Sequence, residues 1–325
     1  MEYRFCGKSG LQLPAISLGL WHNFGDVDNY INSTNMILKA FEKGITHFDL
    51  ANNYGPPPGT AEINFGRIFK ENLKSHRDEM IISSKAGHLM WDGPYGDGGS
   101  RKYIMASIDQ SLKRTGLDYF DIFYTHRYDP QTPLEETIQA IIDIVKQGKA
   151  LYAGISKYPE DKTKEACKMM QEQNVRCLIY QGKYNLLFRE PETAIHPAIE
   201  DLGLGYIVFS PLAQGLLTNR YLNGIPDDSR VARGGFLQRH EVTPEVLAKV
   251  EKLNNIARER NQTLAEMALA WLLNKKTVTS VIVGASSVAQ LETNINTLNN
   301  TQFTDEELLS IEQLIINHQS LTINH

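Results

Sequence analysis

The sequence lacks the features that mark secreted, membrane-spanning and disulfide-rich proteins. Its 325 residues include only three cysteines, Cys6, Cys167 and Cys177, which are widely spaced and form no C-x-x-C pair. We therefore expect reduced structural thiols rather than disulfides or a thiolate metal site. The first ten residues contain no basic segment followed by an apolar one, and no run of about eighteen apolar residues occurs. We expect a cytoplasmic protein that neither enters nor spans a membrane.

Charge of one sign and clustered metal ligands are also scarce. The 33 Lys and Arg residues and the 38 Asp and Glu residues are interspersed and give a net charge of -5. A basic patch is absent, so we expect no nucleic-acid partner. His, Cys, Asp and Glu do not stand together at the spacing of a metal site, so we expect no metal. The remaining composition, with 42% hydrophobic residues, is ordinary for a globular protein with a large core.

Eight short runs rich in β-branched and aromatic residues alternate with amphipathic segments. This alternation is typical of repeated βα units around a parallel sheet. Eight units predict an α/β fold, a (β/α)8 TIM barrel, and the lack of a linker predicts one domain over residues 1–325. The predicted strands are Ile16 to Trp21, Thr46 to Asn52, Met80 to Lys85, Phe120 to His126, Leu151 to Ser156, Cys177 to Gln181, Tyr206 to Ser210 and Ser280 to Gly284.

Other segments predict helix ends and additions to the barrel. The hydroxyl of Thr132 is predicted to cap a helix, which Gly148 is predicted to end. The opening segment, Tyr3 to Leu13, predicts a β-hairpin. Two connections, Ala86 to Arg101 and Ala213 to Gln238, are too long for plain turns. We expect both to be functional loops at the carboxyl-terminal face of the barrel.

Ionisable side chains stand at the ends of three successive predicted strands: Asp49, Lys85 and His126. In barrels of this kind the active site lies at the carboxyl ends of the strands. Taken singly, Asp49 could cap a helix, Lys85 could reach solvent, and His126 could be a satisfied buried imidazole. On neighbouring strands, however, the three indicate a catalytic cluster. Tyr54 follows in the loop after the second strand and joins this cluster.

A tyrosine beside a lysine indicates acid catalysis. The Lys85 ammonium would favour the phenolate and lower the pKa of Tyr54, which could then act as a general acid. Asp49 would keep Lys85 charged and oriented. Lys85 could instead form a Schiff base, as strand-end lysines do in barrel aldolases. Asp49 argues against this alternative, because a carboxylate stabilises the ammonium, whereas an amine nucleophile needs a depressed pKa.

The segment Phe48 to Gly55, with Tyr54 and the three strand-end residues, resembles the aldo-keto reductase superfamily. The resemblance extends over essentially the whole chain. Further motifs are similar to those of bacterial L-glyceraldehyde-3-phosphate reductases and of voltage-gated potassium channel β-subunits; they lie in residues 54–59, 85–101 and 210–217.

This resemblance implies NADPH-dependent reduction of small aldehydes or ketones to alcohols, with L-glyceraldehyde 3-phosphate and methylglyoxal as candidate substrates. It implies Tyr54 as the proton donor, Lys85 and Asp49 as the pair that tunes it, and His126 as the residue that orients the carbonyl. It also implies a homo-oligomer. The likeness to channel β-subunits leaves an alternative, a cofactor-binding and redox-sensing subunit with slow turnover.

The resemblance also implies the cofactor contacts. Ser156 and Gln181 match positions that hydrogen-bond the carboxamide, and Phe209 matches the position on which the nicotinamide stacks. Lys157 stands where many members have asparagine, and Phe209 where they have tyrosine or tryptophan. The full implied set is Trp21, Asp49, Ser156, Gln181, Phe209, Ser210, Leu212, Gln214, Gly215, Leu217, Arg220, Arg230, Gly284, Ser286, Gln290 and Asn294.

The choice between the two nicotinamide cofactors depends on the helix after the last strand. Ser286 and Ser287 precede this helix, whose N-terminus suits a phosphate, although the two serines could equally be simple N-caps. Gln290 stands where many members carry an arginine for the 2′-phosphate, and Thr293 where nearer relatives carry glutamate. We therefore expect NADPH with a weakened preference, and NADH use stays open.

The expected substrate contacts surround the carbonyl group and are Trp21, Tyr54, Trp91, His126 and Arg127. Arg101 and Arg127 are candidates to hold an anionic group such as a phosphate. Alternatively, both arginines are solvated surface side chains.

Overall fold

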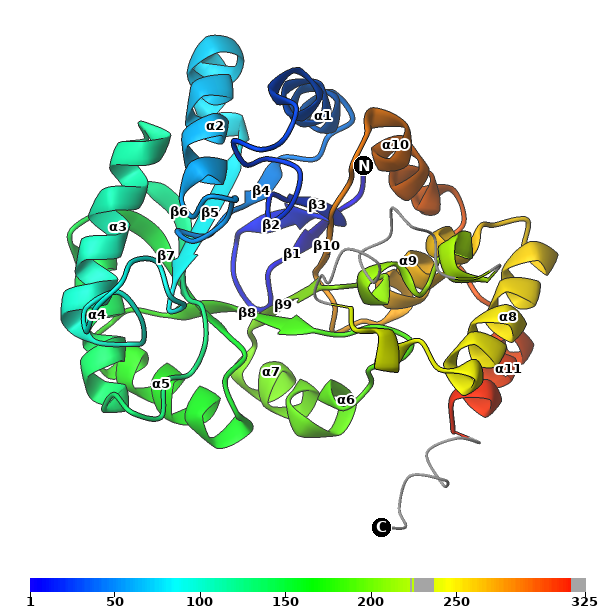
Figure 1. Cartoon of the computed structure of the whole chain (residues 1–325). Helices are drawn as coiled ribbons and strands as arrows, with labels where there is room; N and C mark the ends of the chain where they lie inside the picture. The colour runs from blue at the N-terminus through cyan, green and yellow to red at the C-terminus, as the bar shows by residue number, and fades with distance from the viewer. Residues whose placement is uncertain (223, 225–236, 317–325) are drawn as a thin grey trace.

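The computed structural model describes residues 1–222, 224 and 237–316. Eight parallel strands close into a barrel in the order β10-β3-β4-β5-β6-β7-β8-β9, and helices surround it (Figure 1). The predicted (β/α)8 barrel is confirmed. Its strands are β3 Ile16–Gly19, β4 His47–Asp49, β5 Ile81–Ala86, β6 Phe120–Thr125, β7 Ala150–Ser156, β8 Cys177–Lys183, β9 Gly205–Phe209 and β10 Ser280–Val283.

Each predicted strand matches one barrel strand, with ends that differ by a few residues. The largest difference is at β4, which ends at Asp49 rather than at Asn52. The chain nevertheless continues beside β5, because the Leu50 and Asn52 amides each donate to a β5 carbonyl at 2.9 Å. Asp49 therefore lies where the regular ladder stops and the loop at the carboxyl end begins.

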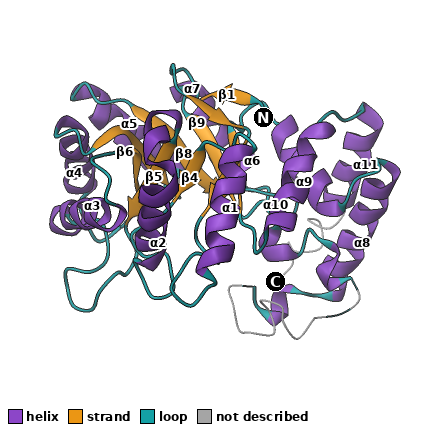
Figure 2. Ribbon diagram, turned by 90° about the horizontal axis from the view of Figure 1, so that it is seen from above, coloured by secondary structure: helices purple, strands orange, loops and turns teal. Residues whose placement is uncertain are grey.

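The helices form the outer layer around the strands (Figure 2). Apolar residues at helical spacing face the barrel, as in the predicted helix α4, where Ile138, Ile141 and Ile142 are buried. Burying each such side chain contributes about 1.5–3 kcal/mol. The helices are α1 Tyr30–Glu42, α2 Thr60–Ile68, α3 Arg101–Thr115, α4 Leu134–Lys146, α5 Glu160–Glu172, α6 Pro191–Ala194, α7 His196–Leu202, α8 Pro244–Glu259, α9 Leu264–Asn274, α10 Val288–Asn296 and α11 Asp305–Ile316.

The two ends of α4 differ in how well the sequence predicted them. Gly148 follows the helix with φ of 72°, as expected for a residue that ends it in the left-handed region. The predicted cap at Thr132 is wrong, because Pro133 occupies the N-cap position and no side chain caps the helix. The Thr132 hydroxyl donates instead to the Asp129 carboxylate at 2.7 Å. The helix begins one residue later than predicted, so Thr132 precedes the N-cap position.

The predicted N-terminal hairpin is confirmed as two antiparallel strands, β1 Tyr3–Phe5 and β2 Gln12–Pro14. Its buried residues Cys6 and Leu13 pack against barrel residues such as Leu178, near the start of β8. The Lys8 amide also donates at 2.9 Å to the carbonyl of Gly203, which precedes β9. The hairpin thus covers the amino-terminal end of the barrel and leaves the opposite end to the loops that follow the strands.

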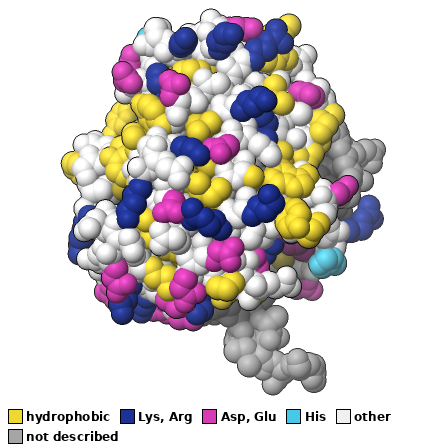
Figure 3. Space-filling model, turned by 90° about the vertical axis from the view of Figure 1, so that its left-hand side faces the viewer, with side chains coloured by type: hydrophobic (Ala, Val, Ile, Leu, Met, Phe, Trp, Pro, Cys, Tyr) yellow, Lys and Arg dark blue, Asp and Glu magenta, His cyan; other side chains and the backbone are white. Residues whose placement is uncertain are grey.

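The surface has mixed charge on the side that Figure 3 shows, where acidic and basic side chains alternate without a continuous basic area. In the described part of the chain, no helix combines the length and the apolar character that a membrane span needs. The three cysteines are buried and free, as predicted.

Candidate active site

The barrel brings the four predicted catalytic side chains together. Asp49 ends β4, Lys85 lies near the end of β5, and His126 follows β6 directly. The Lys85 ammonium lies 2.5 Å from the Asp49 carboxylate and 5.0 Å from the centre of the Tyr54 ring. The Tyr54 ring in turn lies 5.8 Å from the His126 ring, centre to centre. A carboxylate–ammonium ion pair, a phenol and an imidazole thus share one site at the carboxyl end of the barrel.

The Asp49 carboxylate is the centre of a buried hydrogen-bond network. Its Oδ1 accepts from the Ser83 hydroxyl at 2.8 Å and from the Gln181 amide at 3.1 Å, while its Oδ2 accepts from Lys85. The Lys85 ammonium donates a second bond to the Leu50 carbonyl at 2.7 Å. Charge-assisted bonds of this kind fix both ions of a buried pair, because neither can turn without leaving a charge unpaired.

The network continues below the catalytic residues through side chains that the sequence prediction missed. Nε2 of His47 lies 3.0 Å from the Ser83 hydroxyl, and Nδ1 lies 2.9 Å from the Ser17 hydroxyl. Ser17 continues to Ser280 at 2.6 Å. The signal was strand periodicity: His47 stands two residues before Asp49, and Ser83 stands two before Lys85, so each pair shares one face of its strand.

The structure does not reproduce the lowered pKa expected for Tyr54. Burial raises the pKa of the Tyr54 phenol well above its usual value, and the Asp49 charge raises it further. The main reason is burial, which penalises the charged phenolate, and Lys85 does not offset it as a free ammonium because it is paired with Asp49. Burial also lowers the pKa of Lys85, whereas Asp49 opposes that shift. Tyr54 therefore keeps its proton, as a proton donor requires.

His126 is held as a neutral imidazole. Burial lowers its pKa well below the usual value, and the positive charges of Lys85, Lys157 and Arg127 lower it further. Its Nδ1 is buried and has no hydrogen-bond partner in the described part of the chain. A neutral imidazole beside a phenol can donate one hydrogen bond to a carbonyl oxygen without changing the charge of the site.

Ser156 and Gln181 are neighbours in the β7–β8 ladder. The buried Ser156 hydroxyl has no partner within the described residues, so it is free to bond a ligand amide. Gln181 is oriented by its bond to Asp49. Phe209 ends β9, is partly exposed, and packs against the buried cluster that includes Ile207.

The loop after β9 turns tightly through residues in the left-handed region: Ser210, Ala213 and Gln214 have φ of 53°, 47° and 59°. Gly215 follows with φ of 100°. Leu212 accepts from the Gly215 amide at 2.9 Å and from the Leu217 amide at 3.2 Å, which closes the turn. Arg220 is exposed in a short 3-10 helix, Asn219–Tyr221. Arg230 lies outside the described residues.

After β10, Gly284 is exposed and Ser287 caps α10, accepting from the Gln290 amide at 3.2 Å. Ser286 is not the cap, since its amide and hydroxyl both donate to the Gln290 side-chain oxygen, at 2.8 and 3.0 Å. The buried Asn294 amide nitrogen has no partner among the described residues. The first turn of α10 thus presents polar groups, and Gln290 folds back onto it.

Comparison with known proteins decides the family. The model of the aldo/keto reductase family matches residues 15–316. The chain is 54% identical over 321 residues to an L-glyceraldehyde 3-phosphate reductase of Escherichia coli K12, covering 97% of this chain and 92% of that protein. It is 35% identical over 302 residues to a probable voltage-gated potassium channel subunit beta of Arabidopsis thaliana, covering 91% and 90%. The chain belongs to the aldo/keto reductase family. It is an oxidoreductase, of a family whose members generally use NAD(P)H.

Around the catalytic residues of this aldo/keto reductase, the predicted substrate contacts differ in position. The Trp21 ring lies 6.3 Å from the Tyr54 ring. Arg127, next to His126, donates to the Gly87 carbonyl at 2.7 Å and to Asp97 at 3.1 Å. Trp91 packs on Tyr103, with ring centres 5.2 Å apart. Trp21 therefore lies beside Tyr54, and Arg127 directly follows His126 in the chain.

Arg101 does not face the site. Its guanidinium pairs with Asp143 of α4 at 2.5 Å, so the hypothesis that it holds a substrate anion is wrong. Two other basic residues stand at the catalytic end and were not predicted as substrate contacts: Lys157, directly after β7, and His88, after β5. The Lys157 ammonium lies 2.8 Å from Nε2 of His88. Side chains that reach across a neighbouring strand leave no spacing signal in the sequence.

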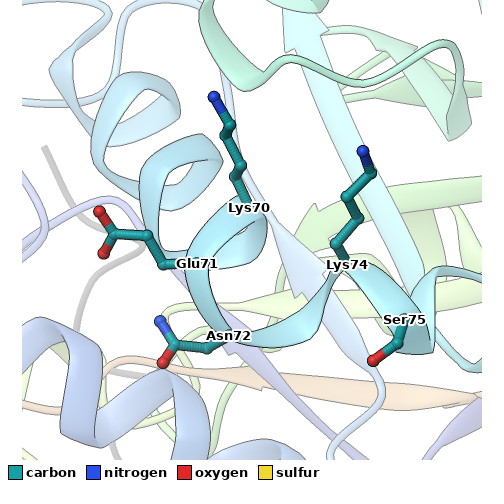
Figure 4. Close-up of a pocket in the computed structure, with 5 residues that line it drawn as sticks. All are labelled: Lys70, Glu71, Asn72, Lys74 and Ser75. Carbon is teal, nitrogen blue, oxygen red and sulfur yellow. The ribbon is translucent and has the colours of Figure 1, made fainter.

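Outside the catalytic end, a surface hollow follows α2 and is lined by Lys70, Glu71, Asn72, Lys74 and Ser75 (Figure 4). All five residues are exposed, and Glu71 is already paired with Arg67 at 3.0 Å. We assign this hollow no role in the reductase. In the parts of the chain that the structure describes, no three His, Cys, Asp or Glu residues form a metal-binding group.

Proposed function

We propose that this aldo/keto reductase reduces small aldehydes and ketones to alcohols with NADPH, and that L-glyceraldehyde 3-phosphate is a substrate. The observation that carries the proposal is the Lys85–Asp49 pair at 2.5 Å beside Tyr54 and His126. The similarity to an L-glyceraldehyde 3-phosphate reductase supports the choice of substrate. Methylglyoxal is a second candidate, because it offers the same kind of small aldehyde.

Each residue of the cluster has a distinct role in this proposal. His126, neutral and buried, donates a hydrogen bond that orients the substrate carbonyl. Tyr54 donates its proton to the carbonyl oxygen as negative charge develops there. Lys85, held by Asp49, stabilises the phenolate that Tyr54 becomes, because the ammonium then gains a second negative neighbour. These contacts are strongest in the transition state, which is the condition for catalysis.

The residues at the carboxyl ends of β7, β8 and β9 fit a nicotinamide cofactor. The unpartnered Ser156 hydroxyl and the Gln181 side chain match a carboxamide, and the Phe209 ring can stack on a flat heterocycle. The tight turn after β9 and the first turn of α10 offer polar groups to phosphates. When bound, the reduced nicotinamide supplies the hydride. Trp21, beside Tyr54, completes the proposed cofactor contacts.

NADPH rather than NADH is proposed on the family resemblance. Gln290 offers an amide where an arginine would carry charge, so discrimination by α10 is weak. Arg220, after β9, and Arg230 are the positive side chains proposed to compensate.

We also propose that the protein is cytoplasmic, forms one domain and assembles into a homo-oligomer. Three buried free cysteines support a reducing compartment. The oligomer follows from the family resemblance, and sedimentation of the purified protein tests it.

Tyr54→Phe tests the proposed function. We expect the variant to bind NADPH but to lose about 10²–10⁴-fold in turnover, because the ring stays and the proton donor goes. NADPH and NADH oxidation is followed with glyceraldehyde 3-phosphate, methylglyoxal and 4-nitrobenzaldehyde. Tyr30→Phe, on α1, is the matched control and should keep wild-type turnover.

Two results would contradict the proposal. Tight cofactor binding with no turnover of any carbonyl by the wild-type protein would indicate a sensing subunit. Activity without nicotinamide, together with borohydride trapping of substrate on Lys85, would indicate an aldolase.

A further inference from the structure

Basic side chains from three neighbouring strand ends meet beside His126. Lys157 follows β7, Arg127 follows β6, and His88 lies in the loop after β5. The Lys157 side chain reaches past β6 to place its ammonium 2.8 Å from Nε2 of His88. The His88 ring lies edge-on to the His126 ring, with centres 4.5 Å apart. The cluster of Lys157, Arg127 and His88, here called the basic triad, thus borders the residue that orients the carbonyl.

The Lys157 ammonium lacks an acidic partner. No Asp or Glu of the described residues lies within 4.0 Å of it, whereas Lys39, Lys149, Lys162 and Lys164 each pair with a carboxylate at 2.6–2.7 Å. Its neighbour His88 is neutral, since burial lowers the His88 pKa to about 4. The Lys157 side chain is exposed, so its ammonium is accessible to an anionic ligand. The backbone of Lys157 has a φ of 56°, a conformation that few residues other than glycine adopt and that costs free energy.

Arg127 contributes a second oriented cation. Its Nε is fixed on the Gly87 carbonyl at 2.7 Å, and Nη2 on Asp97 at 3.1 Å. Nη1 has no partner within the described residues. Asp97 cancels one of the two positive charges of Lys157 and Arg127. The triad and Asp97 together therefore carry a net charge of about +1. An anion that approaches His126 would therefore meet a guanidinium held in place and an ammonium that has no acidic partner.

The position of the triad in the barrel favours the substrate over the cofactor. The closed strand order places β6 opposite β10, with three strands between them on either side. The proposed phosphate contacts of the cofactor follow β9 and β10, whereas the triad follows β5, β6 and β7. The cofactor phosphates would thus lie away from the triad, and the cofactor would approach it only with the uncharged carboxamide proposed to bind Ser156, which directly precedes Lys157.

We propose that the basic triad recognises an anionic group of the carbonyl substrate, a phosphate ester a few bonds from the reacting carbon, with Lys157 as the residue that determines this specificity. This proposal rests on the proposed function. It assigns Lys157 to the substrate, although this position, where many relatives have asparagine, is next to the proposed carboxamide contact Ser156.

The test compares two substrates that differ only in the phosphate, glyceraldehyde 3-phosphate and glyceraldehyde. We expect Lys157→Met to lower the ratio of their kcat/KM values about tenfold or more, because one charge-assisted contact is lost. The loss should lie mainly in KM for the phosphorylated substrate, and Lys157→Arg should restore most of the ratio. Lys168→Met, an exposed lysine on α5, is the control. An unchanged ratio in Lys157→Met would overturn the proposal.

A binding measurement keeps this result separate from the proposed reduction. Calorimetry with inorganic phosphate on the protein saturated with NADP+ should show a site that Lys157→Met weakens and Lys168→Met does not. Such a site would support the triad even if neither aldehyde were reduced, in which case only the proposed function would fail. Equal phosphate binding by the wild-type protein and Lys157→Met would overturn the triad.

Discussion

Asp49 is the residue that connects the buried polar side chains inside the barrel. Three side chains from two other strands donate to its carboxylate: Ser83, Lys85 and Gln181. Because Gln181 also stands at a proposed cofactor contact, Asp49 links the proton-donating side of the site to the cofactor side. Removing this carboxylate would leave Lys85 as an unpaired buried charge, which typically costs about 3–5 kcal/mol.

His47 makes stability depend on pH. Burial lowers its pKa from 6.5 to about 4, with Lys85 lowering it further and Asp49 opposing the shift. The unfolded chain takes up this proton at a higher pH than the folded protein does. The contribution of His47 is therefore complete above about pH 6.5 and is lost as the pH falls toward about 4.

We expect the wild-type protein to lose roughly 2 kcal/mol more of its unfolding free energy between about pH 7 and about pH 5 than His47→Asn does. Urea denaturation at the two pH values measures the difference. His76→Asn, at a more exposed position, should keep the wild-type slope. Identical slopes for the wild-type protein and His47→Asn would show that the buried imidazole is not the source.

At the residue scale, the sequence predicted which side chains gather but not their electrostatics. Asp49, Lys85 and His126 were predicted because strand ends are visible as the ends of apolar runs. The direction of the Tyr54 pKa was predicted wrongly, because the burial of the phenol, which is the main cause of the raised pKa, cannot be judged from the sequence. His88 and Lys157 were missed because their contact spans a strand that lies between them.

Among the secondary-structure elements, α10 has a first turn that departs from its expected role. Gln290, on that turn, bonds Ser286 instead of pointing away from the helix. The helix dipole still favours an anion there, but no cationic side chain of α10 reinforces it.

Gln290→Arg should therefore raise the preference for NADPH over NADH by about tenfold, since it adds a charge-assisted contact to the 2′-phosphate. Fluorescence titration with each cofactor measures the two dissociation constants. Asn296→Arg adds the same charge farther along α10 and should leave the ratio near the wild-type value. If both variants shift the ratio equally, a general electrostatic effect rather than a direct contact would explain it.

The sequence predicted the ends of helices correctly where a local capping motif determines them. Thr263 and Glu266 form a capping box at the start of α9, as such a spacing predicts. Thr132 failed as a cap because the helix starts one residue later and Pro133 occupies the N-cap position. The alternation of elements was enough to predict the barrel, since eight βα units have one common way to close.

At the scale of the whole molecule, the two ends of the barrel have separate tasks. The hairpin covers the amino-terminal end, and every predicted catalytic residue stands at the carboxyl-terminal end. The hairpin fits closely, because a Cβ added at Gly205 would clash with Sγ of Cys6.

We expect Gly205→Ala to lower the free energy of unfolding by about 1–3 kcal/mol, because the added methyl group displaces the hairpin. Cys6→Ala removes the clashing sulfur, so the double variant should be less destabilised than the sum of the two single variants. A urea double-mutant cycle measures this coupling. If the effects of the two substitutions on the free energy of unfolding add strictly, the predicted clash between residue 205 and Cys6 is not the cause of the destabilisation.

The hairpin also sets the order in which the nascent protein can be completed. Cys6 and Leu13 leave the ribosome well before Ile207 and Ile282, which belong to the last two strands and to the cluster that covers them. At roughly 5–20 residues per second, translation separates these partners by tens of seconds. For most of that time the barrel residues that cover the hairpin have not been synthesised, so its apolar side chains are accessible to chaperones. Closure of the barrel and docking of the first strands are therefore among the last events of synthesis.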